Sequence, residues 1–269
     1  MVDDRKNKHK KKGRFVKPLY KIGHGGTLDP LASGVLVVAV GTGTKQLQSY
    51  LDGSKVYVGE GLFGAVTDTY DSEGKTMERA PYVHVTREAL ESVLDQFRGT
   101  IQQIPPKYSA LKVNGRPMYE YARKGLEIPR EIAAREVTIH SLTLEAFTTE
   151  HDYTIPAAAE SGDDGSTPAT TENTPAETQD DQPRPAMFRI RVECGGGTYI
   201  RSLIYDIGRA VNSAAHMVKL TRVQQGCFVL GDNVQEVEAC DITTVPKMIE
   251  DAKQRIAKQS AVAPATTQS

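Results

Sequence analysis

The chain has 269 residues, of which 39% are hydrophobic and 25% charged, so it can bury the core of one large or two small globular domains. No apolar run approaches the roughly 20 residues of a membrane-spanning helix, and the lysine-rich N-terminus lacks the apolar core of a secretory signal. We therefore expect a soluble protein with no membrane partner.

The cysteines point to a reducing compartment. Cys194, Cys227 and Cys240 are odd in number and far apart, and they form neither a CxxC pair nor a cluster at zinc spacing. We expect no disulfide framework and no metal, and an intracellular location.

The net charge of −1 hides a strong segregation of charge. Residues 150–181 carry nine acidic residues and no Lys or Arg, which leaves 33 basic against 25 acidic residues elsewhere. Residues 1–21 alone hold nine Lys or Arg against two Asp. A basic body with a separable acidic segment favours a polyanion-binding protein, although a solvated surface with a polar tail has the same charge.

The N-terminal segment, residues 1–20, shows no apolar periodicity and is predicted to be a disordered basic arm. A nuclear-localisation signal, an RNA-contacting arm and a plain solvated terminus all fit this composition.

A glycine-rich turn follows, GHGGTLDPLASG, which contains His24 and Asp29. Its glycines do not follow a dinucleotide fingerprint, because Leu28 stands where that motif needs glycine, and the chain has no GxxxxGK[ST]. Glycines here allow a sharp turn and a close approach of another molecule. Asp29 precedes Pro30 and is held out of helical geometry, and taken alone it is typical of an Asx-turn. The run from Val35 to Val40 then predicts a buried strand.

Alternation in KVYVGEGLFG predicts a strand over residues 55–64, and Thr86 is the expected N-cap of a helix that Gly99 closes. In REVTIHSLTLEAF the apolar residues change phase after Ile139, which predicts a strand with a bulge. The segment 150–185, rich in Ala, Thr, Pro and acidic residues, is predicted to be a disordered acidic insertion.

MFRIRVEC alternates cleanly and predicts a strand directly after the insertion, which then lies inside one domain. In GGGTYIRSLIYDIGRAV, Thr198 is the expected N-cap of a helix whose apolar stripe runs from Ile200 to Val211. Arg201 sits in the first turn, where a cation opposes the helix dipole, so we expect an anionic partner nearby. Residues 251–269 are predicted to be a C-terminal tail.

Hairpin-like pairs recur without a regular βαβ period. The fold class expected is therefore α+β, with an extended mixed or antiparallel sheet flanked by helices and loops and a site in a cleft across the sheet. The body of the domain is expected in two parts, 21–149 and 186–250.

Five segments together resemble the TruB family of tRNA pseudouridine synthases, in the family's order and over most of the chain. The segment GTGTK and the acidic insertion are most similar to the family's eukaryotic branch. The matching segments are KIGHGGTLDPLASGVLVVAVGTGTK, KVYVGEGLFGAVTDTYDSEG, IPPKYSALKVNGRPMYEYARKG, CGGGTYIRSLIYDIG and AHMVKLTRVQQGCF.

The resemblance implies the pseudouridine synthase fold and a set of site residues. Asp29 matches the catalytic aspartate, Tyr57 the tyrosine that stacks on the target base, and Arg201 the arginine that pairs with the aspartate. His24 matches a histidine that helps the target nucleotide leave its stack, and Leu220 an apolar residue under the site. The substrate-binding residues expected are His24, Gly25, Gly26, Thr27, Tyr57, Lys112 and Leu220, with Tyr108 as support.

The implied reaction is the isomerisation of uridine to pseudouridine in the T loop of tRNA, at the position numbered 55. It needs no cofactor and no metal, because no net redox change or hydrolysis occurs. A carboxylate near C1′ can act as a nucleophile or stabilise a cationic centre, an aromatic face can hold the base, and the base must first leave its stack. Whether Asp29 attacks C1′, attacks the base or supports a glycal route stays open.

The implied partner is the T arm of tRNA, with mRNA sites that mimic the T loop as further targets, and the chain is expected to act as a monomer. A catalytically impaired RNA-binding or tRNA-folding protein is the alternative. Family members carry a strand with a KPxGx[ST] motif before the glycine-rich turn, whereas only residues 1–23 precede His24. We therefore expect an N-terminally shortened member, located in the nucleus, the mitochondrion or the cytoplasm.

Overall fold

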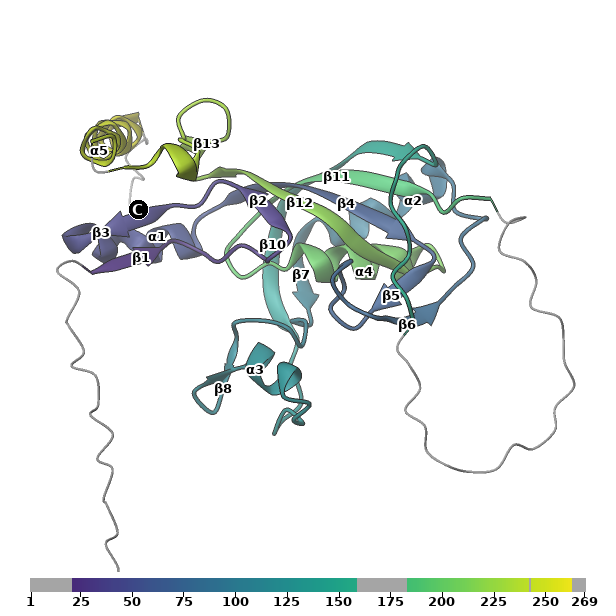
Figure 1. Ribbon diagram of the computed structural model, residues 1–269. Coiled ribbons are helices and arrows are strands. Elements are labelled where there is room, and N and C mark those ends of the chain that lie inside the picture. Colours follow the sequence, from purple (N-terminus) through teal and green to yellow (C-terminus); the bar gives the residue numbers. More distant parts are fainter. Residues whose placement is uncertain (1–20, 159–182, 242, 263–269) are drawn as a thin grey trace, which may run out of the picture.

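A central sheet forms the body of the molecule in the computed structural model, which describes residues 21–158, 183–241 and 243–262 (Figure 1). The strands follow the order β13-β12-β4-β11-β10-β7, all antiparallel, and β2 adds to β12 in parallel. This mixed sheet with flanking helices confirms the expected α+β class. Its strands are β2 (Ala32–Gly34), β4 (Lys55–Phe63), β7 (Gly99–Gln103), β10 (Arg135–Thr148), β11 (Met187–Cys194), β12 (Ala215–Gln225) and β13 (Phe228–Val229).

Three two-stranded sheets and several helices surround the central sheet. The small sheets pair β1 (Ile22–His24) with β3 (Val38–Val40), β5 (Ala65–Thr67) with β6 (Thr76–Arg79), and β8 (Lys112–Val113) with β9 (Arg116–Pro117). The helices are α1 (Leu47–Asp52), α2 (Arg87–Val93), α3 (Met118–Arg123), α4 (Ile200–Ala210) and α5 (Val245–Val262), with 3-10 turns at Gly41–Gln46, Leu94–Phe97 and Val237–Ala239.

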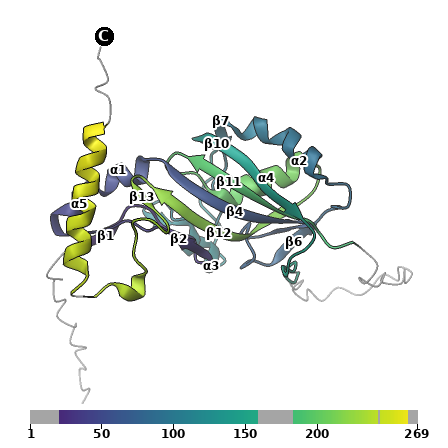
Figure 2. The same ribbon diagram turned by 90° about the horizontal axis from the view of Figure 1, so that it is seen from above.

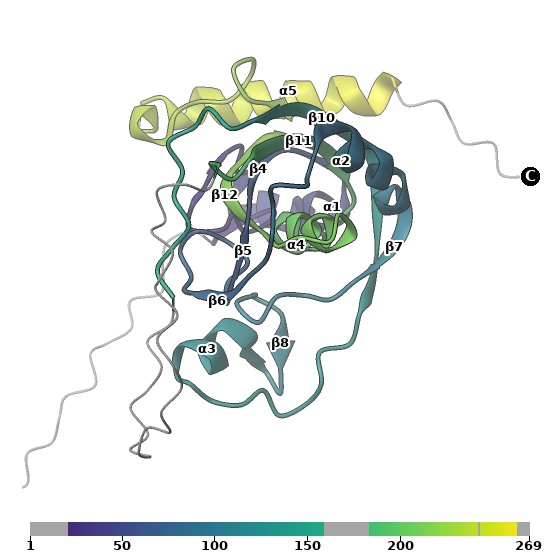
Figure 3. The ribbon, with the colours of Figure 1, turned by 90° about the vertical axis from the view of Figure 1, so that its right-hand side faces the viewer.

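Helix α4 lies inside the curve of the sheet, where the main core forms (Figure 3). Its apolar stripe is buried as the helical spacing predicts, from Ile200 to Val211. The strand β4 faces it with glycines: a Cβ at Gly61 would lie 2.5 Å from the Phe188 ring and 2.8 Å from Ile204. The missing side chains let α4 pack closely against β4.

Two local predictions are wrong. The run from Val35 to Val40 was expected to be one buried strand, but only β3 is a strand and Val38 is 56% exposed. Within the described residues β3 pairs only with β1, in a two-stranded sheet apart from the central one. Thr198 is not an N-cap through its side chain: its hydroxyl donates to the Gly195 carbonyl, and Tyr199 occupies the N-cap position.

The bulge expected in the strand after residue 135 is confirmed, because the register of β10 against β11 shifts after Ile139. The Thr86 cap is confirmed too, since its hydroxyl accepts from the Ala89 amide at 3.2 Å. Helix packing and cross-strand register therefore follow the local pattern wherever the pattern is long.

The acidic insertion differs from the expected 150–185 at both ends. The Tyr153 hydroxyl donates to Glu60 at 2.5 Å, and Arg184 donates to the His151 carbonyl at 2.7 Å. Residues 159–182 lie outside the described residues, as does the basic arm expected over 1–20. The strands on either side of the insertion, β10 and β11, are antiparallel neighbours.

The tail expected from residue 251 is helical through Val262, because α5 continues across that position. It lies at the end of the molecule that carries β1 and α1 (Figure 2). No helix among the described residues is long and apolar enough to cross a bilayer.

Gly34 is a sensitive point of this fold. Its φ is +101°, and a Cβ there would lie 2.2 Å from the Arg222 carbonyl oxygen of β12. We expect Gly34→Ala to lower the free energy of unfolding by about 3 kcal/mol in a denaturant titration, since backbone on both sides must move. Gly115→Ala, at φ +78° in open space, should lose only about 1 kcal/mol; equal losses would contradict the role of the close contact.

Candidate active site

An ion pair between Asp29 and Arg201 forms the centre of the site. The Arg201 Nε donates to Asp29 Oδ2 at 2.8 Å, and its Nη2 donates to Oδ1 at 3.0 Å, which is a bidentate geometry. The arginine side chain is 5% exposed and the aspartate 26%. The pair therefore presents one reachable carboxylate, that of Asp29, and the buried arginine fixes its direction.

Arg201 is held by two further chain segments. Its Nη1 donates to the Thr69 carbonyl at 2.9 Å, and its Nη2 donates to the Tyr108 carbonyl at 3.0 Å. Asp71, 5% exposed, lies 3.5 Å from Nη1 and adds a second negative charge. These contacts explain the arginine in the first turn of α4: two carboxylates offset both the burial and the helix dipole.

Burial raises the pKa of the Asp71 carboxyl, while the Thr69 hydroxyl and the Arg201 guanidinium oppose that rise. Thr69 Oγ1 donates to Asp71 Oδ1 at 2.6 Å. Tyr70, between them, has a φ of +63°, an uncommon conformation for a tyrosine. The conformation of this turn therefore places the Asp71 carboxylate next to the buried Arg201 guanidinium.

The glycine-rich turn is held from β12. Arg222, 1% exposed, donates to the Val35 carbonyl at 2.6 Å and to the Gly26 carbonyl at 3.1 Å. Gln225 donates to the Gly25 carbonyl at 2.5 Å. A Cβ at Gly25 would lie 2.7 Å from Tyr50 Cβ, so the turn needs glycine for packing as well as for approach.

Tyr57 and Leu220 lie on the α4 face of the sheet and are 9% and 4% exposed. Burial raises the pKa of the Tyr57 phenol, and the neighbouring Arg222 guanidinium opposes this rise, while the nearby Asp29 charge adds to it. Leu220 pairs with Gly59 of β4 and with Ala32 of β2, just after the aspartate turn.

The structure thus joins Asp29 to Arg201. Tyr57 and Leu220 are linked to the same turn through their strand partners, Arg222 and Ala32. His24 is exposed on β1 and pairs with Val38, Gly25 is buried, and Thr27 is exposed. Lys112 is also exposed, on β8, and none of its described contacts reaches the ion pair. Lys112 therefore stays a predicted substrate contact, and the structural support comes from Tyr108, whose carbonyl accepts from Arg201.

The sequence prediction missed Asp71, Arg222 and Gln225. Asp71 lies in the quoted TDTYDSEG segment, and its only signal was a second acidic residue close to a turn glycine. Arg222 and Gln225 had a weaker signal, because they lie among several other polar residues of the same strand. No group of three or more His, Cys, Asp or Glu in the described ranges could hold a metal ion.

Asp206, the acidic residue of α4, faces a separate cavity of about 530 Å³. Asp206 lines it with Tyr70 and Tyr205, whose rings stack at 4.4 Å. Burial raises the pKa of Asp206 to about 6. The folded state therefore binds a proton more tightly than the unfolded chain, and the charged carboxylate lowers stability above that pKa.

We expect Asp206→Asn to raise the free energy of unfolding by about 1.5 kcal/mol at pH 8, a value discounted for partial exposure. The gain should shrink as the pH falls through 6 and become small near pH 4, where the folded carboxyl is protonated and only the unfolded one is still partly charged. Urea titrations at pH 8 and pH 4 measure it, with Asp232→Asn as an exposed control. A gain that is equal at both pH values would contradict this reading.

Residues 11–163 match the N-terminal domain of the TruB family of pseudouridylate synthases. The chain is also 42% identical to tRNA pseudouridine synthase 4 of Schizosaccharomyces pombe, over 86% of this chain and 70% of that protein. The chain belongs to the TruB family. The site described above therefore occurs on a TruB scaffold, and the resemblance read from the five segments is confirmed.

Other TruB relatives agree. Pseudouridylate synthase TRUB1 of Homo sapiens is 38% identical over 87% of this chain and 56% of its own length, and tRNA pseudouridine synthase B of Azoarcus sp. is 44% identical over 77% and 56%. The chain spans only part of these proteins. A crystal structure of a Cbf5-Nop10-Gar1 complex is similar at 26% identity and a TM-score of 0.48, over 81% of this chain and 44% of that one.

Proposed function

We propose that this chain is an RNA-modifying isomerase that converts uridine to pseudouridine in tRNA. The observation that carries the proposal is the bidentate pair of Asp29 and Arg201, in which a buried arginine fixes a reachable carboxylate. TruB relatives of this chain bear the names of tRNA pseudouridine synthases, which supports the substrate class.

The reaction breaks the bond from C1′ to N1 of the uracil, turns the base, and forms a bond from C1′ to C5. N1 gains a proton and C5 loses one, so no oxidant, reductant or water is consumed. Arg201 holds the Asp29 carboxylate in one direction, whether that carboxylate attacks C1′, attacks the base or assists a glycal route. Tyr57 offers a ring face for the base and a hydroxyl for proton transfer.

The glycine-rich turn gives the target nucleotide its room. Gly26 has a φ of +138°, and its carbonyl is fixed by Arg222, so main chain without a side chain borders the site. His24 and Thr27 stand exposed at the two ends of this turn. We assign them to contacts with the nucleotide that leaves its stack.

The finer target we propose is the T loop of tRNA, at position 55, with T-loop-like mRNA sites as further substrates and the chain acting as a monomer. Folded RNA loops are recognised by shape and splayed bases, which suits a site open on one side and a chain with a basic excess outside residues 150–181.

The test is nucleoside analysis of a tRNA transcript after incubation with the chain, beside a transcript whose T-loop sequence has been scrambled. We expect pseudouridine in the first transcript, mapped to the T loop, and none in the second. Tight binding of tRNA with no pseudouridine in either would instead support an RNA-binding or tRNA-folding protein.

A further inference from the structure

A small basic module hangs from the sheet, formed by residues 104–135 with β8, β9 and α3 (Figures 1 and 3). It carries seven Lys or Arg against three Glu. Its first residues are tied to α4: Ser202 donates to the Ile104 carbonyl at 3.1 Å, and Arg201 to the Tyr108 carbonyl. The module therefore begins at the candidate active site and continues away from it.

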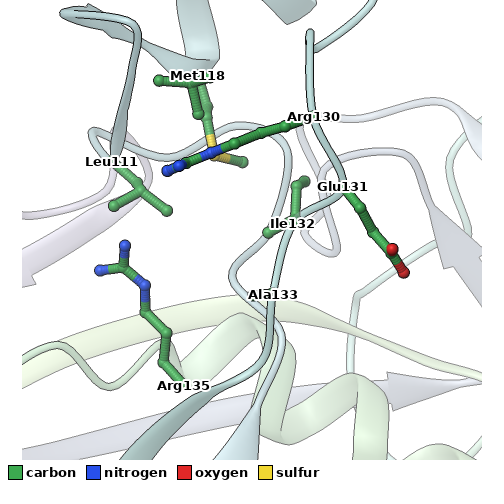
Figure 4. Close-up of a pocket in the computed structure, with 8 residues that line it drawn as sticks. Leu111, Met118, Arg130, Glu131, Ile132, Ala133 and Arg135 are labelled. Atoms are coloured by element: carbon green, nitrogen blue, oxygen red, sulfur yellow. The ribbon is translucent and has the colours of Figure 1, made fainter.

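A hollow of about 310 Å³ opens within this module, between the β8–β9 hairpin and the irregular segment that leads into β10 (Figure 4). Its floor is apolar and includes Val113 and Met118, 2% and 0% exposed, with Leu111 and Ile132 half-buried beside them. This volume is at the lower end of the range for small organic ligands. The floor is already packed, so the hollow is preformed.

Two guanidinium groups converge at its mouth. Arg130 and Arg135 both reach toward Leu111 from opposite sides, while Glu131 points away (Figure 4). Neither arginine side chain has an ion pair or a hydrogen bond in the described part of the chain, unlike Arg116 of the same module, which pairs with Glu120 at 3.7 Å. Two cations without carboxylates above an apolar floor offer a place for a flat group that carries negative charge.

We propose that this hollow holds a splayed-out nucleotide of the RNA substrate, with its base on the apolar floor and its phosphate between Arg130 and Arg135. The proposal rests on the proposed function for the presence of RNA. The lining offers hydrogen-bond donors at the rim and apolar atoms below, so it accepts any base by shape. The module that contains the hollow is connected to Arg201 through Tyr108. The hollow is therefore a second contact with the RNA, separate from the site of the reacting uridine.

The first test is the salt dependence of tRNA binding. Arg130→Gln combined with Arg135→Gln should weaken binding about tenfold at moderate salt and reduce the slope of log Kd against log salt by about 1 to 2. Arg79→Gln, at an exposed arginine of β6, is the matched control and should change neither value as strongly. A double variant with the wild-type slope would overturn the phosphate contact.

The second test fills the hollow. Ala133 lines it, and Ala134, the exposed neighbour, does not. We expect Ala133→Trp to weaken tRNA binding about tenfold, and Ala134→Trp to bind nearly as the wild type. A series of tRNAs, each with a single abasic nucleotide, identifies the nucleotide that enters the hollow. The wild type should bind the tRNA that lacks this base more weakly than intact tRNA. Ala133→Trp should bind that tRNA and intact tRNA equally, because its hollow is already filled.

Additive losses at every abasic position, or unchanged binding by Ala133→Trp, would overturn the proposal. Both tests read affinity, so they stay informative for a chain that binds tRNA without turnover. Conversely, if the chain forms pseudouridine and Ala133→Trp leaves its tRNA affinity unchanged, the proposal for the hollow is wrong and the proposed function still stands.

Discussion

Replacing Asp29 by alanine is expected to abolish pseudouridine formation, with a loss of at least about 10⁴-fold in turnover and less than about threefold in tRNA affinity. The carboxylate is the only reachable group of the ion pair, whereas Arg201 keeps Asp71 and two carbonyls as partners after the change. The fold should therefore survive while the chemistry stops. Single-turnover product analysis and a filter-binding titration measure the two effects.

Asp29→Asn is the matched variant, since it keeps the size of the side chain and an oxygen that accepts from Arg201. It should be as inactive as the alanine variant and bind tRNA like the wild type. If turnover in Asp29→Asn stays within tenfold of the wild type, the carboxylate has no part in the chemistry.

Arg201→Met should have the largest effect on stability, with a loss of about 3 to 5 kcal/mol in the free energy of unfolding and no detectable turnover. The change leaves Asp71 buried without its cation and Asp29 without its bidentate partner. It also leaves the Thr69 and Tyr108 carbonyls without a donor. Urea unfolding at neutral pH measures the loss.

A second substitution separates charge burial from loss of packing. Arg201→Met combined with Asp71→Asn should recover about half of the lost stability, because the uncompensated carboxylate is gone, but no activity. Lowering the pH should also narrow the gap between Arg201→Met and the wild type, since burial already raises the pKa of Asp71 and loss of the cation raises it further. A double variant less stable than Arg201→Met would show that Asp71 acts through its hydrogen bonds and not its charge.

Long periodic segments were predictable from the sequence, because their pattern reflects packing that the structure actually has. The stripe from Ile200 to Val211, the strand β4 and the phase change after Ile139 all appear as expected. The run after Val35 failed for the opposite reason: its composition says that a strand is favoured, but nothing in it says how many neighbours cover that strand.

The N-cap of α4 shows the same limit of prediction from local sequence. Thr198 has the right residue type before α4, yet the Tyr199 amide donates to the side chain of Gln103 at 2.8 Å, a partner from β7 that no local pattern reveals. Tertiary contacts replaced the local cap.

For the site, Asp29 and Arg201 were expected to pair from family motifs and from the odd place of a cation in a first turn, and the structure joins them. Asp71 and Arg222 were missed because their meaning is spatial: each is a buried charge whose partners lie far away in the chain. A sequence shows the charge, but only the fold shows that it is buried and what it holds.

The most direct measurement is tritium release from a tRNA transcript labelled at C5 of uridine, incubated with a molar excess of the wild-type chain. The hydrogen on C5 leaves only when C5 becomes the new glycosidic carbon. We predict one tritium released for each pseudouridine found in the T loop. Retention of the label on tRNA that the chain demonstrably binds would contradict an isomerase centred on Asp29 and Arg201.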